Sequence, residues 1–534
     1  MIADAVTSPV AIALLVAVSV IAWVMSYLLL NRMTSARTSA AAAGDDIVKR
    51  VLRNSAIPIV SQLCVRFVDL GVAIVLLRLL GPEGNGRYAL AVVVWLYVKT
   101  VSDFGLSLLA TRDIARDHAQ TGRLVGATTL LRLIILGFAA VPVGVYVGAG
   151  IWRGTLADES ALAITILYLS IAPSSFSEAA NAALNGHERM DVAALINIGV
   201  SLIRAPLVVV LAATELGVAG VALAALAAAA ISADLFRRGL RRTTGHSTIW
   251  QLRTETGLRL ARASWPLLVN ALLINLFFRV DVFIVQAFRG DAALGVYDAA
   301  YKVINLVTIL PAYVTLAIFP AMAARGDDPA ALGRAQGMAT YLLVWAAWGI
   351  VAAVSAGAGT AIRVLAGSAY LPEAATLLRI LIWFAPLSFF NGVIQYVLVA
   401  AGQQHRIVPA FIVAVTFNLA ANLMLVPVHG ARAAAAVTVA TELIILIAFV
   451  AVTRGGTVRA VSRASAGRVW RPTLAGLITV AVVLPAALRM GEAVAMTLAV
   501  VVFIIATGVA GVVGPAERQL LRRALARRPS APIA

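Results

Sequence analysis

Long uncharged apolar runs recur along the whole chain, and short polar stretches separate them. Each run is long enough to cross the roughly 30 Å hydrocarbon core of a bilayer as a helix. After residue 53 the pattern predicts fourteen spans, near 54–77, 85–110, 125–149, 160–183, 191–213, 217–236, 263–287, 293–323, 338–362, 374–400, 408–427, 431–452, 472–489 and 492–513. An earlier run predicts one more span at about 9–30. A protein that starts at Met33 would lack it, and the sequence leaves both possibilities open.

Composition agrees with this pattern. Hydrophobic residues make up 61% of the chain and charged residues 13%, whereas roughly 25% of the residues of soluble domains are charged. We therefore expect an all-α polytopic membrane protein. Cys64 is the only cysteine, which excludes disulfide scaffolds and cysteine-based metal sites.

The net charge of +18 has a positional explanation. Lys and Arg concentrate in every second loop, above all in 237–262, in 453–471 and in the C-terminal tail, and cytoplasmic loops carry such an excess. The asymmetry predicts a multi-pass protein of the cytoplasmic membrane with a cytoplasmic C-terminus, and it requires no nucleic-acid partner. The loops are also short, which disfavours a membrane glycan polymerase or ligase, because such an enzyme needs a sizeable external loop or domain.

An internal repeat with a period of about 210 residues divides the chain. The matching stretches are GNGRYALA at 84–91 with ALGVYDAA at 293–300, LGVAGVALA at 216–224 with HGARAAAAV at 429–437, Pro58 with Pro266, and Pro173 with Pro386. Six spans thus repeat as six in the same orientation. Two parallel halves of this kind usually enclose a substrate path at their interface.

The predicted domains follow from the repeat. They are an extra N-terminal span with a basic connector at 1–53, an N-lobe of six spans at 54–236, a basic cytoplasmic inter-lobe loop at 237–262, a C-lobe of six spans at 263–452, and a basic loop, two further spans and a basic tail at 453–534.

Charged side chains inside the spans are candidates for the transport path, because charges are costly in a bilayer. The first half contributes Arg66, Asp69, Lys99, Asp103, Arg132, Glu178, Arg204 and Asp234, and the second half Arg279, Asp281, Asp298, Lys302, Arg379 and Glu442. Spacing of three or four places Arg66 with Asp69, Lys99 with Asp103, and Asp298 with Lys302 on common helix faces. Such pairs can also simply neutralise each other so that the helices insert.

Arg66 and Arg279 are the strongest candidates for a substrate contact. Both lie inside the opening span of a half, and Arg279 has no same-face acid within a turn of its helix. Arg204 is similar, while Lys99 and Lys302 are weaker candidates. A polar path is also supported by amides within the spans, although buried amides bridge helices more often than they bind ligands. These amides are Asn181, Asn197, Asn270, Asn275, Asn305, Gln395, Asn418 and Asn422.

No motif of an enzyme or cofactor site is present. The Gly-rich GPEGNG at 81–86 lacks the preceding strand and the following GK[ST] of a phosphate loop, and no HExxH signature or nucleophile elbow occurs. The sequence therefore predicts no enzyme, no cofactor and no metal site.

Residues 53–117 resemble the opening of polysaccharide flippases, which belong to the multidrug/oligosaccharidyl-lipid/polysaccharide exporter superfamily. The resemblance is strongest in RLLGPEGNGRYA and in DFGL at 103–106 followed by TRDIARD, and ALGVYDAAYK at 293–302 is similarly typical. It covers about residues 50–455. The additional span near 9–30 departs from the usual family pattern.

The resemblance implies a two-lobed bundle that works by alternating access. The implied substrate is an undecaprenyl-diphosphate-linked oligosaccharide, moved from the cytoplasmic to the outer leaflet for polysaccharide biosynthesis. It implies that basic side chains facing the central cavity engage the diphosphate, and Arg66 and Arg279 are suitably placed. Residues that would carry a coupling cation or restrain these arginines are Asp69, Asp103, Asp281, Asp298 and Glu178.

The partners implied by the resemblance are the lipid-linked oligosaccharide, the bilayer, and a polysaccharide polymerase or other envelope-assembly proteins. A monomer suffices, because the repeat supplies both halves of a path. Two other functions stay open. The first is a cation-coupled multidrug exporter of the same superfamily, which the intramembrane basic residues disfavour because they repel cationic drugs. The second is a non-transporting scaffold of an envelope-assembly complex.

Overall fold

The computed structural model describes residues 46–308, 311, 329–400, 403–452 and 457–512, and the regular elements in these ranges are helices. Within this part of the chain, 11 helices are long and apolar enough to cross a membrane. The prediction of an all-α multi-pass membrane protein is confirmed. The predicted span near 9–30 and the basic C-terminal tail lie outside the described residues.

The chain divides into two compact units. The first comprises residues 1–298 and 365–369, and the second comprises 299–364 and 370–534. The boundary thus falls at Asp298, inside a helix, whereas the sequence places the start of the C-lobe at residue 263. The predicted lobe limits of 54–236 and 263–452 stay a prediction.

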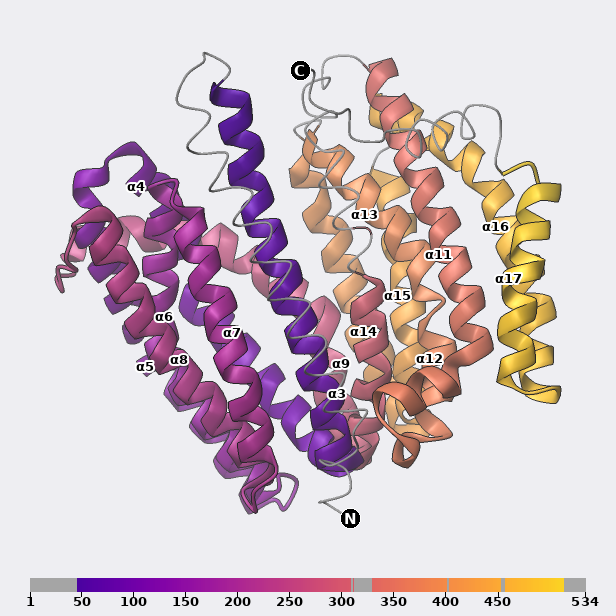
Figure 1. Ribbon diagram of the computed structural model, residues 1–534, viewed down its shortest axis with the longest axis horizontal. Helices are drawn as coiled ribbons and strands as arrows, with labels where there is room; N and C mark the ends of the chain where they lie inside the picture. The colour runs from indigo at the N-terminus through magenta and orange to yellow at the C-terminus, as the bar shows by residue number, and fades with distance from the viewer. Residues whose placement is uncertain (1–45, 309–310, 312–328, 401–402, 453–456, 513–534) are drawn as a thin grey trace, which may run out of the picture. The chain divides into compact units, whose positions relative to one another are not determined.

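The first unit is a bundle in which α6 packs most extensively against α8 and also contacts α3, α4 and α5 (Figure 1). Small side chains permit this close packing, since the buried face of α6 is rich in alanine. Its helices are α3 (Asp46–Asp103), α4 (Leu106–Arg116), α5 (Thr121–Trp152), α6 (Asp158–Gly186), α7 (Met190–Ala212), α8 (Gly217–Thr244) and α9 (Thr254–Val307), the last of which continues into the second unit.

In the second unit, α14 packs along α15, and α16 packs along α17 (Figure 1). Glu492 ties α17 to two other helices of this unit, since its carboxylate accepts hydrogen bonds from the Gly359 amide and from the Arg379 guanidinium, both at 2.8 Å. The helices are α11 (Pro329–Leu365), α12 (Glu373–Leu381), α13 (Phe384–Ala400), α14 (Ile407–His429), α15 (Ala431–Val452), α16 (Thr457–Arg489) and α17 (Glu492–Val509).

The internal repeat recurs in the backbone. Gly81 breaks α3 with φ 66° and ψ −178°, and its counterpart Gly290 breaks α9 with φ 79° and ψ 179°. Gly217 and Gly430, which begin the second matched stretch, both have positive φ, at 49° and 65°. Because residues with a Cβ rarely adopt this conformation, glycine is required at these turns. The turns therefore support the repeat independently of sequence similarity.

Two matched glycines also meet within the first unit. A Cβ added to Gly86 would lie 1.8 Å from the Asp291 carbonyl oxygen, and one added to Gly295 would lie 1.7 Å from the Pro82 carbonyl oxygen. The Asn85 side chain donates to the Gly295 carbonyl at 3.0 Å. The backbones of α3 and α9 therefore touch at this crossing, and a side chain would separate them.

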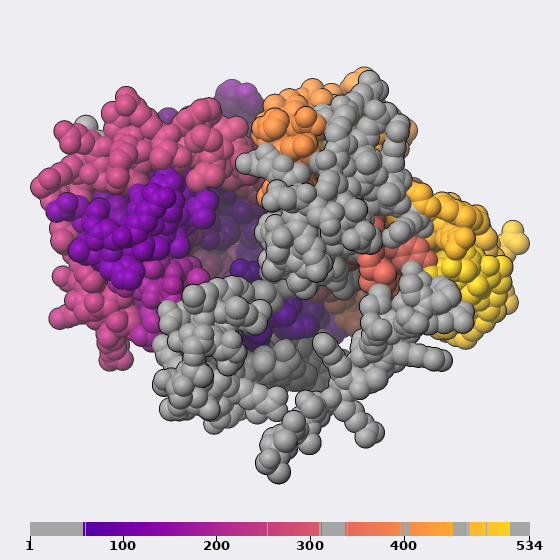
Figure 2. Space-filling view, turned by 90° about the horizontal axis from the view of Figure 1, so that it is seen from above, coloured from indigo at the N-terminus to yellow at the C-terminus, as the bar shows by residue number. Residues whose placement is uncertain are grey.

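Three loops meet at one end of the first unit. The segment after α8 crosses α5 where Gly122 and Gly126 leave room, and the Ile249 amide donates to the Gly122 carbonyl at 3.0 Å. Figure 2 shows pink residues beyond α8 beside the violet residues around α4 and the start of α5. The His118 and His187 rings stack here at 4.2 Å between centroids, and the His246 ring lies 5.7 Å from that of His187.

Candidate functional site

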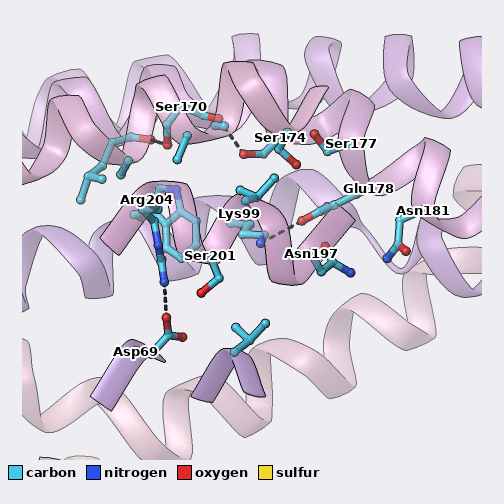
Figure 3. A pocket seen from close by; sticks show the side chains of 18 of the residues that line it. Asp69, Lys99, Ser170, Ser174, Ser177, Glu178, Asn181, Asn197, Ser201 and Arg204 are labelled. Carbon is cyan, nitrogen blue, oxygen red and sulfur yellow. Dashed lines mark hydrogen bonds and ion pairs between the residues drawn. The ribbon is translucent and has the colours of Figure 1, made fainter. Parts of the chain in front are cut away.

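The first unit contains an open cavity of about 960 Å³, lined by α3, α6, α7 and α8 (Figure 3). This volume is at the upper end of ordinary ligand pockets, which span roughly 300–1,000 Å³. Many of its lining side chains are polar or charged, and those of α6 and α7 form two polar rows. We take this cavity as the candidate substrate site.

Helical spacing explains the polar rows. On α6 the cavity residues Ser170, Ser174, Ser177 and Asn181 follow at intervals of four, three and four, which places them on one helix face. On α7 the residues Asn197, Ser201 and Arg204 follow in the same way, and on the second half of α3 the row is Tyr88, Val92, Trp95 and Lys99.

Arg204 and Asp69 form an ion pair between α7 and the first half of α3 (Figure 3). The Ser61 hydroxyl donates to the Ala194 carbonyl at 3.4 Å between the same two helices. Both contact positions advance together along the chain, from 61 to 69 on α3 and from 194 to 204 on α7. The two helices therefore run in the same direction. Arg204 has no acid within a turn on its own helix, and it pairs instead with an acid on the neighbouring helix α3.

Lys99 and Glu178 form a second ion pair in the cavity, with Lys99 Nζ 2.9 Å from Glu178 Oε1 (Figure 3). Lys99 Nζ also lies 4.9 Å from the centroid of the Trp95 ring, within the range of a cation–π contact. Lys99 and Asp103 do not neutralise each other, because each of the two charges has a partner on another helix.

Arg132 on α5 is the partner of Asp103, and its side chain is fully buried. Arg132 Nη2 lies 2.7 Å from Asp103 Oδ1, its Nε lies 4.0 Å from Glu178 Oε2, and its Nη2 donates to Ser107 Oγ at 2.9 Å. A chain of alternating charges thus runs from Asp103 through Arg132 and Glu178 to Lys99. It fixes Lys99 and Glu178 at the cavity wall.

Arg66 differs from the other cations of the cavity. Its side chain is exposed in the lining, and it makes no ion pair or hydrogen bond with any residue that the structure describes. Because Lys99 and Arg204 are each neutralised by an acid, Arg66 leaves the lining with one uncompensated positive charge. Asp69 lies three residues further along the same helix face, but its carboxylate pairs with Arg204 and not with Arg66.

The predicted site residues on α9 are not part of this cavity lining. Asp281 is buried and accepts a hydrogen bond from the Tyr297 hydroxyl. Asp298 is also buried and accepts one from Asn85 Nδ2 at 3.3 Å. Both carboxylates therefore act in the packing of the fold, and their predicted role in cation coupling stays a prediction.

The remaining predicted residues of α9 are more accessible. Arg279 and Lys302 are half-buried and Asn270 is exposed. Asn275 joins α9 to α3. Its side-chain Nδ2 donates to Thr100 Oγ1 at 2.7 Å, and its backbone carbonyl accepts from the Tyr97 hydroxyl at 3.1 Å. A substrate contact for Arg279 and Lys302 stays a prediction.

Asn418 and Asn422 form a buried network in the second unit. Asn418 Nδ2 donates to Thr441 Oγ1 at 3.0 Å, and Asn422 Nδ2 donates to the Asn418 carbonyl at 2.9 Å. Beside Thr441, the buried Glu442 accepts from Asn391 Nδ2 at 2.7 Å. These bonds join α13, α14 and α15, which is the usual work of polar residues between membrane helices.

Sequence reasoning named Arg132 among the intramembrane charges but gave it no role, and it overlooked the serines that line the cavity. The signal for Arg132 is its isolation: no acid lies within the apolar run around it, so its charge must be balanced by another helix. The signal for the lining is the spacing of Ser170, Ser174 and Ser177, which a search limited to charges and amides passes over.

Solved structures of other membrane proteins have a similar fold. The solved structure named "Lipid II flippase MurJ, inward closed conformation" superposes with a TM-score of 0.64 at 11% sequence identity, covering 88% of this chain and 100% of that one. An inward-facing multidrug resistance MATE family transporter of the MOP superfamily gives 0.53 at 16%, covering 73% and 91%. No curated protein matches the sequence. At these identities the structural matches establish the fold alone.

The fold and its polar cavity define a multi-pass membrane protein, and the solved structures with this fold are named as a flippase and a transporter. The family model described as polysaccharide biosynthesis protein matches residues 51–324, which is just over half of the chain, and the MatE model matches residues 266–424. The chain belongs to the polysaccharide biosynthesis protein family. The resemblance to flippases of the multidrug/oligosaccharidyl-lipid/polysaccharide exporter superfamily is confirmed.

Proposed function

We propose that the protein is a flippase for an undecaprenyl-diphosphate-linked oligosaccharide. It carries this lipid from the cytoplasmic to the outer leaflet of the cytoplasmic membrane by alternating access, and the glycan then enters cell-surface polysaccharide. The observation that supports the proposal most directly is Arg66, a cation in a large polar cavity that forms no ion pair with any described residue. A guanidinium binds a phosphate through two parallel hydrogen bonds, which suits an anionic diphosphate.

The arrangement around Arg66 suggests how the diphosphate is held. Arg66, Asp69 and Arg204 all line the cavity, and the three groups together carry one positive charge. A diphosphate that binds Arg66 adds negative charge beside Asp69 and competes with it for Arg204. In this proposal Asp69 holds Arg204 in place until the substrate arrives. Arg279 is a second candidate contact, and its role rests on the family resemblance.

The environment in the cell is part of the same proposal. The excess of Lys and Arg in alternate loops supports a cytoplasmic C-terminus. A flippase of this kind hands its cargo to a polysaccharide polymerase or another envelope-assembly protein, and a monomer with two repeated halves is sufficient for transport.

A deletion of the gene in its native host tests the proposal. We expect lipid-diphosphate saccharides to accumulate and surface polysaccharide to be lost, with recovery by the wild-type protein but not by Arg66→Ala. Arg153→Ala serves as the matched control, because Arg153 is exposed outside the cavity and its side chain has no partner in the described part of the chain.

Two results would overturn the proposal. Normal surface polysaccharide in the deletion strain, together with new sensitivity to cationic drugs, would indicate a multidrug exporter instead. Full recovery by Arg66→Ala, at wild-type protein levels, would remove the diphosphate contact assigned to Arg66.

A further inference from the structure

The cavity has a second set of polar groups besides its charges. The amide side chains of Gln62, Asn181 and Asn197 line it, and none of them makes a hydrogen bond with a residue that the structure describes. Each amide offers two N–H donors and a carbonyl acceptor. Polar side chains in membrane proteins usually bond to a neighbouring helix. These three amides do not, so helix bridging does not account for them.

The serines of α6 add acceptors to the same wall. Ser170, Ser174 and Ser177 each donate a hydrogen bond to a carbonyl of their own helix, at 2.6, 2.8 and 3.3 Å. Their hydroxyl protons are thus used, while the oxygen lone pairs remain free to accept. Figure 3 shows these serines along α6 above the other labelled residues of the cavity.

Two buried groups in the lining have no hydrogen-bond partner among the described residues. They are the hydroxyl of Ser201, which is 5% exposed, and the indole N–H of Trp95. A buried polar group left unpaired is destabilising, and such groups in native proteins call for an explanation. A bound molecule with hydroxyl or carbonyl oxygens would supply the missing partners.

The amides and the Arg204–Asp69 pair lie toward opposite ends of the cavity. Because α3 and α7 run in the same direction, Gln62 and Asn197 lie near one level, and Asp69 and Arg204 lie further along both helices. Figure 3 shows Asn181 and Asn197 on the side of Glu178, and Ser201 between Arg204 and Lys99. A headgroup with an anionic part joined to a neutral polar part can contact both ends of this arrangement.

We propose that the Gln62, Asn181, Asn197 and Ser201 region is a sugar-binding subsite, which holds hydroxyl and acetamido groups of the saccharide next to the diphosphate. This inference rests on the proposed function of the cavity. Sugar hydroxyls and acetamido groups both donate and accept hydrogen bonds, as amide side chains do. The subsite thus selects lipid diphosphates that carry a sugar over those that carry none.

Binding of two synthetic probes to the purified full-length protein tests the subsite. The probes are farnesyl diphosphate and farnesyl diphosphate carrying one N-acetylglucosamine. In the Asn181→Ala/Asn197→Ala variant, we expect binding of the glycosylated probe to weaken by roughly tenfold, since about two hydrogen bonds are lost. Binding of farnesyl diphosphate should stay unchanged, which also shows that the variant folds. Gln251→Ala, an exposed amide outside the cavity, is the control.

Arg66→Ala separates the subsite from the proposed function. It should weaken binding of both probes, because both carry the diphosphate. If it weakens neither, the proposed function fails whatever the amide variants do. If Arg66→Ala weakens both probes but the amide variant affects both equally or neither, the sugar subsite is wrong and the diphosphate site stands.

Discussion

Arg132 has one of the least exposed side chains of the first unit, and its guanidinium is balanced by Asp103 and Glu178. Burying a charged side chain costs free energy because the charge loses its hydration. Only close, hydrogen-bonded partners of opposite charge offset this cost. The alternating order Asp103–Arg132–Glu178–Lys99 gives each charge an opposite neighbour. The functional consequence is that Lys99 and Glu178, which line the cavity, are held in fixed positions.

We predict that Arg132→Leu destabilises the protein by about 3–5 kcal/mol, because it leaves Asp103 and Glu178 without their shared partner. The unfolding temperature of the detergent-solubilised protein measures this change. The double variant Arg132→Leu/Asp103→Leu should regain part of the loss, since one orphaned carboxylate is removed. A single variant as stable as the wild type would refute the charge chain.

The apolar runs predicted which charged side chains lie within the membrane, but the sequence did not predict which of them form ion pairs. Arg66, Asp69, Lys99, Glu178 and Arg204 all line one cavity, as candidates for a single site should. The spacing left open whether Lys99 pairs with Asp103, because i,i+4 spacing shows only that two side chains share a face, and the observed partner of Lys99 is Glu178. Pairing between helices depends on their rotation and depth, which the sequence of one helix does not contain.

At the scale of elements, the crossing of α3 and α9 depends on Gly86 and Gly295. Each glycine lies against the carbonyl of a residue of the other helix, closer than any Cβ allows. The two positions are equivalent in the internal repeat, so the crossing relates corresponding parts of the two halves. The sequence revealed this equivalence, but not that the two glycines touch.

We predict that Gly86→Ala destabilises the protein by about 1–3 kcal/mol or more, because the helices must separate to admit the methyl group. Gly137→Ala is the control: nothing lies within 4 Å of a Cβ at that position of α5. It should be neutral or stabilising by up to about 1 kcal/mol, as alanine favours helix. Thermal unfolding in detergent distinguishes the two, and equal unfolding temperatures would contradict the close crossing.

The histidines at the loop end of the first unit give its stability a pH dependence. The pKa of His187 is lowered from its ordinary value of 6.5, first by partial burial and then by repulsion from His118 and His246. His187 also pairs with Thr121 Oγ1 at 2.8 Å. A lowered pKa means that the folded protein binds a proton less readily than the unfolded chain.

We therefore predict that stability contributed by neutral His187 is present above about pH 6.5 and is lost as the pH falls below it. Unfolding temperatures at about pH 7.5 and about pH 5.5 measure the loss, and His187→Gln should reduce the difference. His405→Gln, an exposed histidine of the second unit, should leave it unchanged. Equal pH dependence in wild type and His187→Gln would contradict the assignment.

At the scale of the whole molecule, the hydrophobic pattern predicted an all-α multi-pass fold because a bilayer-spanning helix needs about 20 apolar residues. The family resemblance rested on three short motifs: RLLGPEGNGRYA, which contains the helix break at Gly81, DFGL followed by TRDIARD, and ALGVYDAAYK, which follows the helix break at Gly290. The neutral lining of the cavity was not predictable in the same way. Single serines in apolar runs are common, and only the packing of α3, α6, α7 and α8 gathers them into one wall.

Transport of a lipid-linked saccharide by a site that contains Arg66 is the central claim, and a reconstituted assay tests it most directly. The purified protein is placed in liposomes with a fluorescent, sugar-bearing polyprenyl diphosphate, and movement between leaflets is followed by accessibility to a membrane-impermeant quencher. Wild type and Arg153→Ala should move the lipid equally fast. Arg66→Ala should slow the movement by roughly tenfold or more, because a hydrogen bond to a charged group contributes about 1.5–3 kcal/mol. Lipid movement at the wild-type rate in Arg66→Ala, or no movement in wild-type liposomes, would contradict the claim.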